Sequence, residues 1–294
     1  MDKKLVLGTA QIGMNYGITN SKGKVKTNEA YQILDKAYSL GIRELDTAQS
    51  YGDAEFTIGA INNKSNRFLI NTKITFEENE FEAQKSTESM YKKLYKSLKN
   101  INQQKINSLM IHNGSLINHK SIGLIEWSKE LKKNNLINSF GASIYEDSEI
   151  PEAILENLDF LQVPYSIFNQ DFEKSNLFKN CLEIDIKLQV RSIFCQGIVL
   201  CEKDYLPEWL NENDRKILDT FHILINNSTY SKLDFACSFI KDKDWINSIV
   251  IGVTSINELI EIINTFNMRE KIENKEIINL CNCLSKKIKD PRNW

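Results

Sequence analysis

Four side chains that could exchange a proton with a substrate stand at or just after short apolar runs in the first 112 residues. Asp46 and Tyr51 follow one another closely, Lys73 lies near the end of the next run, and His112 ends the one after that. If these runs are neighbouring strands of a parallel barrel, their carboxyl ends meet at one rim, where α/β barrels carry their active sites. The sequence therefore predicts one site that holds a carboxylate, a phenol, an ammonium and an imidazole.

The lysine of this group indicates its own partner. Lys73 lies in the apolar run Phe68–Ile74, where an isolated buried charge would cost several kcal/mol, so Asp46 is its expected counter-ion. Taken alone, Asp46 could cap a turn, His112 could be a hydrogen-bonded core histidine, and Tyr51 could serve packing only. Their occurrence together at consecutive strand ends favours chemistry.

The elements that must position these residues alternate between strand and helix along the whole chain. Short apolar, β-branched runs bounded by turn residues predict eight strands, at Leu5–Ala10, Glu44–Ala48, Phe68–Ile74, Ser108–His112, Ser139–Ile144, Phe160–Val163, Leu188–Ile193 and Ser248–Val253. Helical periodicity predicts helices at Asn28–Ser39, Gly52–Asn62, Glu82–Lys99, Ile122–Lys133, Glu149–Glu156, Glu173–Cys181, Asp214–Lys241 with a break near Asn227, Asn257–Phe266 and Glu276–Lys289. This order predicts an α/β fold, a single-domain (β/α)8 TIM barrel over residues 1–294, with a C-terminal helix and tail at 276–294.

The composition makes a small molecule the expected partner. The 294 residues suit one closed α/β barrel, which typically needs about 250. The net charge is −2, with 41% hydrophobic and 26% charged residues, so neither a nucleic-acid nor a membrane surface is indicated. The start has no cleavable leader and no run reaches membrane length, so we expect a cytoplasmic protein, monomeric or weakly homo-oligomeric. The six cysteines form no C-x2-C pair, so neither a metal site nor a disulfide framework is expected.

The segment Leu45–Gly52, Leu-Asp-Thr-Ala-Gln-Ser-Tyr-Gly, resembles the signature Asp-Thr-Ala-x-x-Tyr-Gly of the aldo-keto reductase superfamily. Lys73 and His112 match the lysine and histidine of that family, so its complete catalytic set is present. The likeness extends from the first strand through all eight units to Ile251–Gly252. It implies an NAD(P)-dependent oxidoreductase that reduces an aldehyde or ketone to an alcohol, or runs the reverse reaction.

The resemblance implies a role for each of the four residues. Tyr51 is the general acid–base that gives a proton to the substrate oxygen or takes one from it. An ordinary tyrosine has a pKa of about 10, and the cationic Lys73 is expected to lower the pKa of Tyr51 by favouring phenolate. Asp46 holds Lys73 charged and fixed, and His112 forms a hydrogen bond with the substrate carbonyl. The cofactor supplies the hydride, and the protein supplies position and polarity.

The resemblance also predicts the residues that surround the nicotinamide. Ser143 and Gln162 match the family's carboxamide-binding residues, although Ile144 replaces the asparagine that follows the serine. Arg191 and Ser192 begin a segment that resembles the family's aromatic-Ser-Pro-Leu-x-x-Gly, with Arg191 in place of the ring that stacks on the nicotinamide. A guanidinium plane can stack as well, and its charge would favour the reduced, neutral nicotinamide. The expected contacts are completed by the first strand, at Gly8 and Thr9.

The segment after the eighth strand resembles the family loop that holds the adenosine phosphates. Gly252, Thr254, Ser255 and Glu258 belong to it, and a helix N-terminus with exposed amides and hydroxyls suits a phosphate. No Lys or Arg occurs from Gly252 through Phe266, where NADPH-preferring members place the cation for the 2′-phosphate. We therefore expect NADP(H) or NAD(H), with NADP slightly favoured by the resemblance alone.

The substrate is less well specified. The tail Arg292–Trp294 could fold over the barrel mouth and line the substrate pocket, or pack on the surface. The compact form resembles bacterial aldo-keto reductases found among enzymes of surface-polysaccharide and nonulosonic-acid biosynthesis, which implies a sugar or nucleotide-sugar substrate. Two other functions are open: a catalytically silent barrel that binds nicotinamide nucleotide as a sensor or partner subunit, and a lyase or isomerase with a Schiff base at Lys73. The complete catalytic set disfavours the first, and pairing of Lys73 with Asp46 disfavours the second.

Overall fold

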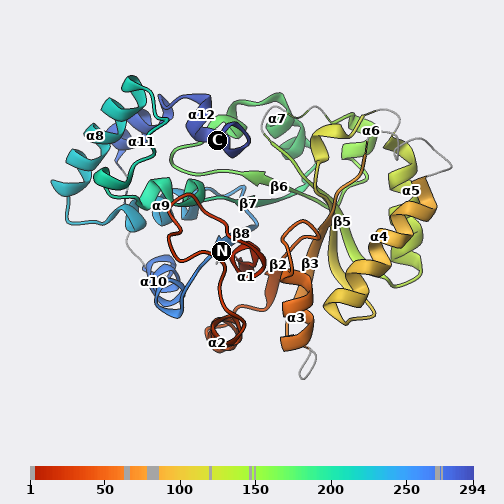
Figure 1. Cartoon of the computed structure of the whole chain (residues 1–294). Helices are drawn as coiled ribbons and strands as arrows, with labels where there is room; N and C mark the ends of the chain where they lie inside the picture. The colour runs from red at the N-terminus through yellow and green to blue at the C-terminus, as the bar shows by residue number, and fades with distance from the viewer. Residues whose placement is uncertain are drawn as a thin grey trace.

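The computed structural model describes residues 4–62, 67–77, 86–118, 121–145, 148, 150–268, 272 and 274–294. Its parallel strands close into a barrel in chain order, with β1 paired to β2 on one side and to β8 on the other (Figure 1). The strands are Lys4–Gly8 (β1), Glu44–Asp46 (β2), Leu69–Ile74 (β3), Ile106–Ile111 (β4), Ile137–Ser143 (β5), Phe160–Pro164 (β6), Lys187–Arg191 (β7) and Ser248–Gly252 (β8). The predicted (β/α)8 TIM barrel is therefore confirmed.

Helices surround the strands (Figure 1). The longer ones are Thr27–Ser39 (α2), Ala54–Asn62 (α3), Ser86–Ile101 (α4), Ile122–Lys133 (α5), Asn176–Glu183 (α7), Glu212–Asn226 (α8), Lys232–Lys241 (α9), Ile256–Asn267 (α10) and Lys275–Asn282 (α11). Three are single turns, at Ala10–Gly13 (α1), Glu152–Leu155 (α6) and Lys286–Lys289 (α12). No helix among the described residues is long and apolar enough to cross a membrane.

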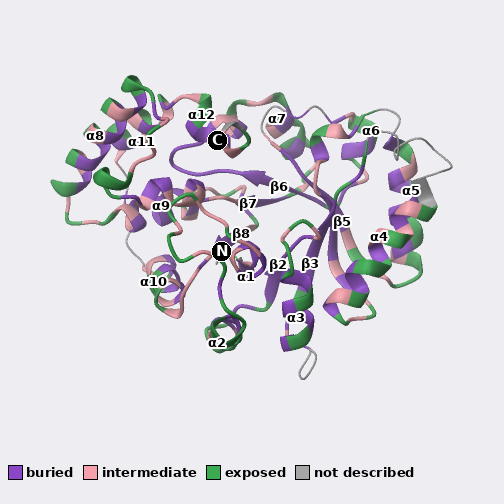
Figure 2. Ribbon diagram, viewed as in Figure 1, coloured by how far each residue is buried: buried purple, intermediate pink, exposed green. Residues whose placement is uncertain are grey.

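Burial explains why the apolar runs form strands and the periodic segments form helices. Val6 and Leu7, which point to opposite faces of β1, are both fully buried, as expected for a parallel strand between barrel interior and helices. Figure 2 shows the same layering, with buried strands and helices that are buried on one side and exposed on the other. In α2 the buried residues recur at helical spacing: Ala30, Ile33, Leu34 and Ala37.

Several predicted strands are too long at their carboxyl ends. β1 ends at Gly8, because Ala10 already belongs to the single turn α1, which the sequence analysis missed. β2 ends at Asp46 and β7 ends at Arg191. In a barrel the residues just beyond these ends leave the hydrogen-bonded ladder and form the loops that carry the site. The apolar character of those loop residues made them look like strand.

The helices differ from prediction mainly where caps interrupt them. The predicted helix Glu173–Cys181 is a short 3-10 turn followed by α7, because the Ser175 hydroxyl accepts a hydrogen bond from the Phe178 amide and starts a new helix there. The expected break near Asn227 is confirmed between α8 and α9. The predicted helix Glu276–Lys289 is split into α11 and α12. Two further predicted helices have other bounds in the structure. The predicted helix Glu82–Lys99 is Ser86–Ile101 (α4), and the predicted helix Glu149–Glu156 is Glu152–Leu155 (α6). Residues 82–85 and 149 lie outside the described residues.

Candidate active site

The four predicted catalytic residues meet at the carboxyl ends of β2, β3 and β4. Asp46 is the last residue of β2, Lys73 is the fifth of the six residues of β3, and His112 directly follows β4. The strands are neighbours in the sheet, with Lys73 in register with Met110 of β4. Lys73 Nζ lies 2.5 Å from Asp46 Oδ2 and 3.4 Å from Tyr51 Oη. The structure therefore brings the predicted set together.

Lys73 is held by three acceptors. Its ammonium donates to Asp46 Oδ2 at 2.5 Å, to the Thr47 carbonyl at 3.1 Å and to Tyr51 Oη at 3.4 Å, which uses all three of its N–H donors. The side chain is fully buried, and Asp46 is nearly so. Burial lowers the pKa of Lys73, and the Asp46 carboxylate opposes that shift. The position of the ammonium is thus determined by its hydrogen bonds.

A close backbone contact positions Tyr51. Gly13 in α1 lies so near the loop after β2 that a Cβ at this position would stand 1.8 Å from the Tyr51 carbonyl oxygen. Gly52 has a positive φ of 55°, and a Cβ there would meet the Gly13 carbonyl oxygen at 2.2 Å. Only glycine allows this approach. The missed turn α1 is therefore part of what fixes the tyrosine.

The pKa of Tyr51 shifts in the direction opposite to the one expected from the sequence. Burial raises the pKa of Tyr51 above its ordinary value, and the nearby Asp46 carboxylate raises it further, while the Arg191 guanidinium lowers it. The expectation that Lys73 lowers this pKa is wrong for the structure as it stands, because the loss of water around the phenol outweighs the neighbouring cations. Tyr51 is consequently a neutral phenol at ordinary pH.

His112 is also neutral. Its ring meets the Tyr51 ring edge to face, with centroids 5.7 Å apart, and its Nδ1 lies 3.0 Å from the Ser50 hydroxyl. Burial, together with the charges of Lys73 and Arg191, lowers the pKa of His112 to about 3. The imidazole can therefore donate or accept one hydrogen bond toward a ligand without carrying charge.

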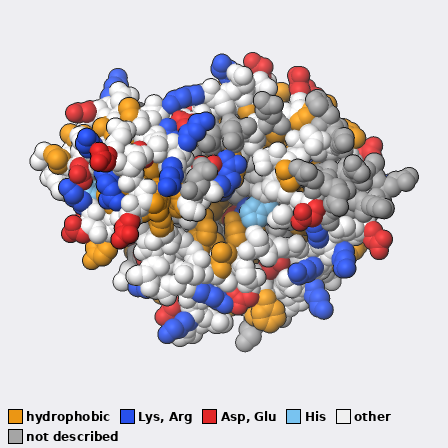
Figure 3. All heavy atoms as spheres, turned by 45° about the horizontal axis from the view of Figure 1, so that its top comes forward, with side chains coloured by type: hydrophobic (Ala, Val, Ile, Leu, Met, Phe, Trp, Pro, Cys, Tyr) orange, Lys and Arg blue, Asp and Glu red, His pale blue; other side chains and the backbone are white. Residues whose placement is uncertain are grey.

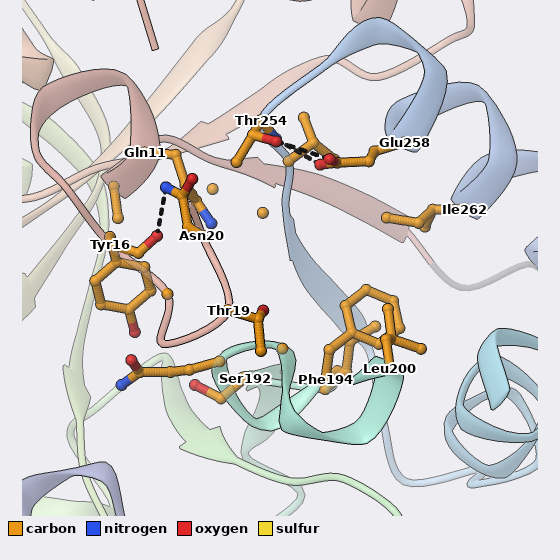
Figure 4. Close-up of a pocket in the computed structure, with 18 of the residues that line it drawn as sticks. Gln11, Tyr16, Thr19, Asn20, Ser192, Phe194, Leu200, Thr254, Glu258 and Ile262 are labelled. Carbon is orange, nitrogen blue, oxygen red and sulfur yellow. Dashed lines mark hydrogen bonds between the residues drawn. The ribbon is translucent and has the colours of Figure 1, made fainter. Parts of the chain in front are cut away.

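A cavity of about 420 Å³ opens beside these residues. Figure 3 shows a hollow near the middle of the face, with a histidine side chain at its edge and basic side chains nearby. We call one end of the cavity, lined by Asp46, Tyr51 and Arg191, the catalytic end. The other end we call the α10 end; there Thr254 precedes α10 and Glu258 lies in its first turn (Figure 4). A small-molecule ligand fits a cavity of this volume.

A model of the aldo/keto reductase family matches residues 4–282. The chain belongs to this family. Similar solved structures include an aldo-keto reductase from Bacillus halodurans in its holo form, with a TM-score of 0.72, 19% identity, and coverage of 98% of this chain and 92% of that one. Its apo form gives a TM-score of 0.68 and 19% identity over 97% and 91% of the two chains. A Pseudomonas aeruginosa protein assigned to the aldo-keto reductases gives a TM-score of 0.64 and 17% identity, with coverage of 89% of this chain and 88% of that one.

These structural likenesses show the fold, and family membership implies NAD(P)H-dependent oxidoreduction of a carbonyl. No curated protein sequence matches the chain. The cavity is therefore the place to test for a nicotinamide nucleotide. Of the ten residues predicted to hold one, seven line the cavity: Gly8, Thr9, Arg191, Ser192, Gly252, Thr254 and Glu258. The other three, Ser143, Gln162 and Ser255, are not part of its lining.

Gln162 nevertheless fits a carboxamide. Its amide nitrogen donates to Asp46 Oδ1 at 2.8 Å and to Gln189 Oε1 at 2.6 Å, which leaves its own Oε1 buried without a hydrogen-bond partner among the described residues. A buried acceptor without a donor is costly, and an amide N–H group of a ligand would satisfy it. The residues present are therefore compatible with the nicotinamide group that the aldo-keto reductase family uses.

Arg191, which the sequence predicts to lie beside the nicotinamide, is the last residue of β7 and lines the cavity. Its guanidinium donates to Ser143 Oγ and to the Ile144 carbonyl, both at 3.3 Å, and lies 4.7 Å from the centroid of the Tyr145 ring. These partners are neutral. Arg191 and the predicted carboxamide contact Ser143 are thus joined directly, and the cation stays without a carboxylate partner in the described part of the chain.

The segment predicted to hold phosphate already contains an internal carboxylate. Glu258 accepts hydrogen bonds from the Thr254 amide and from the Thr254 hydroxyl, both at 2.7 Å. The Ser255 hydroxyl caps α10 by accepting from the Glu258 amide at 3.3 Å. The donors that the sequence analysis offered to a phosphate are therefore engaged, because the α10 N-terminus is neutralised by Glu258.

Two loops that sequence reasoning did not include form much of the remaining wall. Tyr16, Thr19 and Asn20 come from the loop between α1 and α2, and Phe194 and Gln196 come from the loop after β7 (Figure 4). The loops are joined by a hydrogen bond from the Ile18 amide to the Gln196 carbonyl at 3.2 Å. The glycines at 17, 23 and 197, all with positive φ, were the available signal that these segments turn sharply.

The C-terminal tail reaches the same neighbourhood from outside. The Arg292 guanidinium lies 3.6 Å from the centroid of the Tyr145 ring, the ring that Arg191 also contacts. Trp294 instead packs against Trp209, with ring centroids 5.5 Å apart. Neither Arg292 nor Trp294 lines the cavity. Among the described residues no cluster of His, Cys, Asp or Glu could hold a metal ion.

Proposed function

We propose that this chain reduces an aldehyde or ketone to an alcohol with a nicotinamide nucleotide as hydride source and Tyr51 as the general acid. The observation that carries the proposal is the position of Lys73 Nζ, 2.5 Å from Asp46 Oδ2 and 3.4 Å from Tyr51 Oη, at the end of a cavity suited to the cofactor. A structural ion pair alone would not need a phenol as its third neighbour.

Burial favours the reductive direction. Tyr51 is a neutral phenol because burial raises its pKa, so it holds the proton that a developing alkoxide requires. As Tyr51 gives up this proton, negative charge forms on its oxygen, which already accepts a hydrogen bond from Lys73. The ammonium thus stabilises the product of proton transfer. Asp46 keeps the ammonium in place throughout.

His112 orients the substrate oxygen. If the Ser50 hydroxyl donates to His112 Nδ1 at 3.0 Å, the neutral ring carries its proton on Nε2 and offers it to the carbonyl. A pKa lowered to about 3 excludes imidazolium at neutral pH, so His112 contributes a hydrogen bond and no charge. Tyr51 and His112, in edge-to-face contact, would then hold one oxygen between them.

The cofactor, when bound, supplies the hydride to the carbonyl carbon. Gln162 would hold its carboxamide through the unpartnered Oε1, with Ser143 as the second expected contact. Arg191, beside Ser143, would lie next to the nicotinamide and favour its neutral, reduced form. These assignments follow from the family pattern and from the side chains that surround the catalytic end.

Replacement of Tyr51 by phenylalanine tests the proposal. Tyr51→Phe removes only the hydroxyl, so we expect reduction of a generic aldehyde to slow by about 1,000-fold while NADH or NADPH binding, followed by fluorescence, changes less than about twofold. Tyr31→Phe is the matched control, because it removes the same hydroxyl from an exposed tyrosine of α2 that does not line the cavity. Normal turnover in Tyr51→Phe, or loss of cofactor binding in that variant, would contradict the assigned role.

The proposal extends to a sugar or nucleotide-sugar carbonyl as the substrate. It is supported by the resemblance of this compact chain and its tail to bacterial members from surface-polysaccharide and nonulosonic-acid gene sets. Kinetics with keto-sugars, aldoses and simple aromatic aldehydes of similar size would measure the preference. A higher kcat/KM for the aromatic aldehydes than for every sugar would contradict this extension and leave the reductase proposal intact.

A further inference from the structure

We infer that the α10 end of the cavity selects a dinucleotide with a free adenosine 2′-hydroxyl, so that the chain binds NAD(H) in preference to NADP(H) through Glu258 and Glu261. The inference rests on the proposed function, because it assumes that the nicotinamide lies at the catalytic end. It runs against the slight preference for NADP that the family resemblance implies.

The charges that line the cavity are arranged unequally. Asp46 at the catalytic end is paired with Lys73, whereas Glu258 and Glu261 line the α10 end and form no ion pair within the described chain. No Lys or Arg occurs from Gly252 through Phe266 to offset them. If the nicotinamide lies beside Tyr51, the adenosine must extend toward these two carboxylates.

Glu258 is fixed in its position. Each of its carboxylate oxygens accepts a hydrogen bond from Thr254 at 2.7 Å, one from the amide and one from the hydroxyl. Figure 4 shows this pair on the α10 side of the cavity, opposite Gln11 and Asn20. The carboxylate thus takes the amide and hydroxyl that a phosphate would otherwise use, and it lies in the cavity wall.

Glu261 adds a second, more exposed charge one turn along α10. A carboxylate accepts hydrogen bonds from ribose hydroxyls, which is how acidic residues recognise the adenosine ribose of NAD in other folds. A 2′-phosphate carries about −1.5 to −2 charges at neutral pH, so two nearby carboxylates would repel it. At an effective dielectric constant of about 20, repulsion over several ångströms corresponds to at least a tenfold loss of affinity.

Lys22 is the cation that could oppose this selection. It lines the cavity from the loop between α1 and α2, and its backbone amide donates to Asn20 Oδ1 at 3.0 Å. Its side chain is exposed and forms no ion pair with either glutamate in the described structure. We expect this cation to bind the diphosphate that both dinucleotides share and so to support both equally, which the Lys22→Gln variant tests.

Calorimetric titration of the full chain with ADP-ribose and with 2′-phospho-ADP-ribose measures the selection directly. These probes lack the nicotinamide, so the result does not depend on catalysis. We expect the phosphorylated probe to bind at least about tenfold more weakly, and the difference to shrink as NaCl rises from 50 to 500 mM because salt screens the repulsion. Equal or tighter binding of the phosphorylated probe would overturn this inference and leave the proposed function intact. Failure of NADH, NADPH and both probes to bind would instead refute the proposed function, and this inference with it.

Charge-removing variants identify the source of the selection. Glu261→Gln removes an exposed carboxylate that caps no helix, and Glu258→Gln keeps an acceptor for Thr254, so either variant should fold. We expect the double variant to narrow the difference between the probes about tenfold. Glu126→Gln is the control, because it removes an exposed carboxylate on α5 that does not line the cavity. It should leave the difference in affinity between the two probes unchanged. If Lys22→Gln weakens only the phosphorylated probe, Lys22 recognises the 2′-phosphate and the inference fails.

Discussion

The catalytic end and the α10 end of the cavity hold their charges in different ways. At the catalytic end the fully buried ammonium of Lys73 on β3 is enclosed by a carboxylate, a carbonyl and a phenol from the end of β2 and the loop after it. At the α10 end Glu258 is held by the backbone and hydroxyl of one residue four positions earlier, and Glu261 lies exposed. The first arrangement needs two neighbouring strands, β2 and β3, and the loop after β2, whereas the second needs only the start of one helix.

This difference indicates which residues can be replaced singly and which cannot. Strand-end residues that satisfy one another cannot be exchanged singly, because each removal leaves a buried group unpaired. Residues on a helix start or in a loop contact fewer neighbours, so their charge can change without loss of the fold. Catalysis should therefore be shared across the family, and cofactor preference should be particular to the chain.

The largest effect is expected at the catalytic end, from loss of the buried ion pair between Asp46 and Lys73. Asp46→Asn leaves the buried Lys73 ammonium without its counter-ion, so we expect a loss of about 3 kcal/mol in the free energy of unfolding, measured with urea. Asp53→Asn is the matched control, because Asp53 pairs with Lys24 at the same distance of 2.5 Å on the exposed surface. It should change the free energy by less than about 0.5 kcal/mol. Similar values for the two variants would show that burial of the catalytic pair has no energetic consequence.

A smaller effect is expected in the loop wall between the two ends. Gly197 has a φ of 103°, and a Cβ there would stand 1.9 Å from Thr19 Oγ1, so Gly197→Ala should push the two loops apart and weaken cofactor binding about tenfold, with kcat nearly unchanged. Gly41→Ala has the same kind of backbone strain at a φ of 93° but meets no atom within 4 Å. Any loss of binding in that control would assign the effect to strain in general and not to the contact with Thr19. Fluorescence titration gives both constants.

The charge of Arg191 should have an effect of a few-fold. Arg191→Gln removes the cation beside the expected nicotinamide site, so the ratio of the Kd for NAD⁺ to the Kd for NADH should fall by about threefold. Arg43→Gln is a suitable control, since Arg43 stacks on Tyr38 at 3.9 Å, with no residue of the pair in the cavity lining. An unchanged ratio in Arg191→Gln would show that the guanidinium lies away from the bound ring.

The least change is expected with pH. His112 has a pKa lowered to about 3 and stays neutral above pH 5, and burial raises the pKa of Tyr51, so it stays protonated well above pH 8. The kcat/KM for reduction should therefore vary less than about twofold from pH 6 to pH 9. A fall in rate below pH 7 would indicate that His112 titrates in its ordinary range. A fall above pH 8 would show that Lys73 lowers the pKa of Tyr51 in the working enzyme, as the sequence alone predicts.

Much of the fold could be predicted because a parallel barrel strand is buried on both faces and reads as an apolar run. The strand ends could not be predicted in the same way, since the apolar residues of α1 continue the pattern of β1 although the chain has already turned. The meeting of Asp46, Tyr51 and Lys73 could be predicted for a related reason: polar residues at the ends of apolar runs have few structural explanations, and the spacing of Asp46 and Tyr51 matches a family signature. Of the predicted cofactor residues, seven line the cavity and three do not, because the cavity wall comes largely from loops whose path depends on distant segments.

The sequence by itself determined the barrel, the order of its elements and the residue types that meet at the ends of β2, β3 and β4, since burial patterns and local signatures are written along the chain. Only the tertiary structure decided how those groups behave. The pKa of Tyr51 depends on how much water its neighbours exclude, the reach of Glu258 to Thr254 depends on how α10 begins, and the approach of Gly13 to Tyr51 depends on two segments far apart in sequence. Solvation and contact are properties of the packed molecule, so no single segment of the chain contains them.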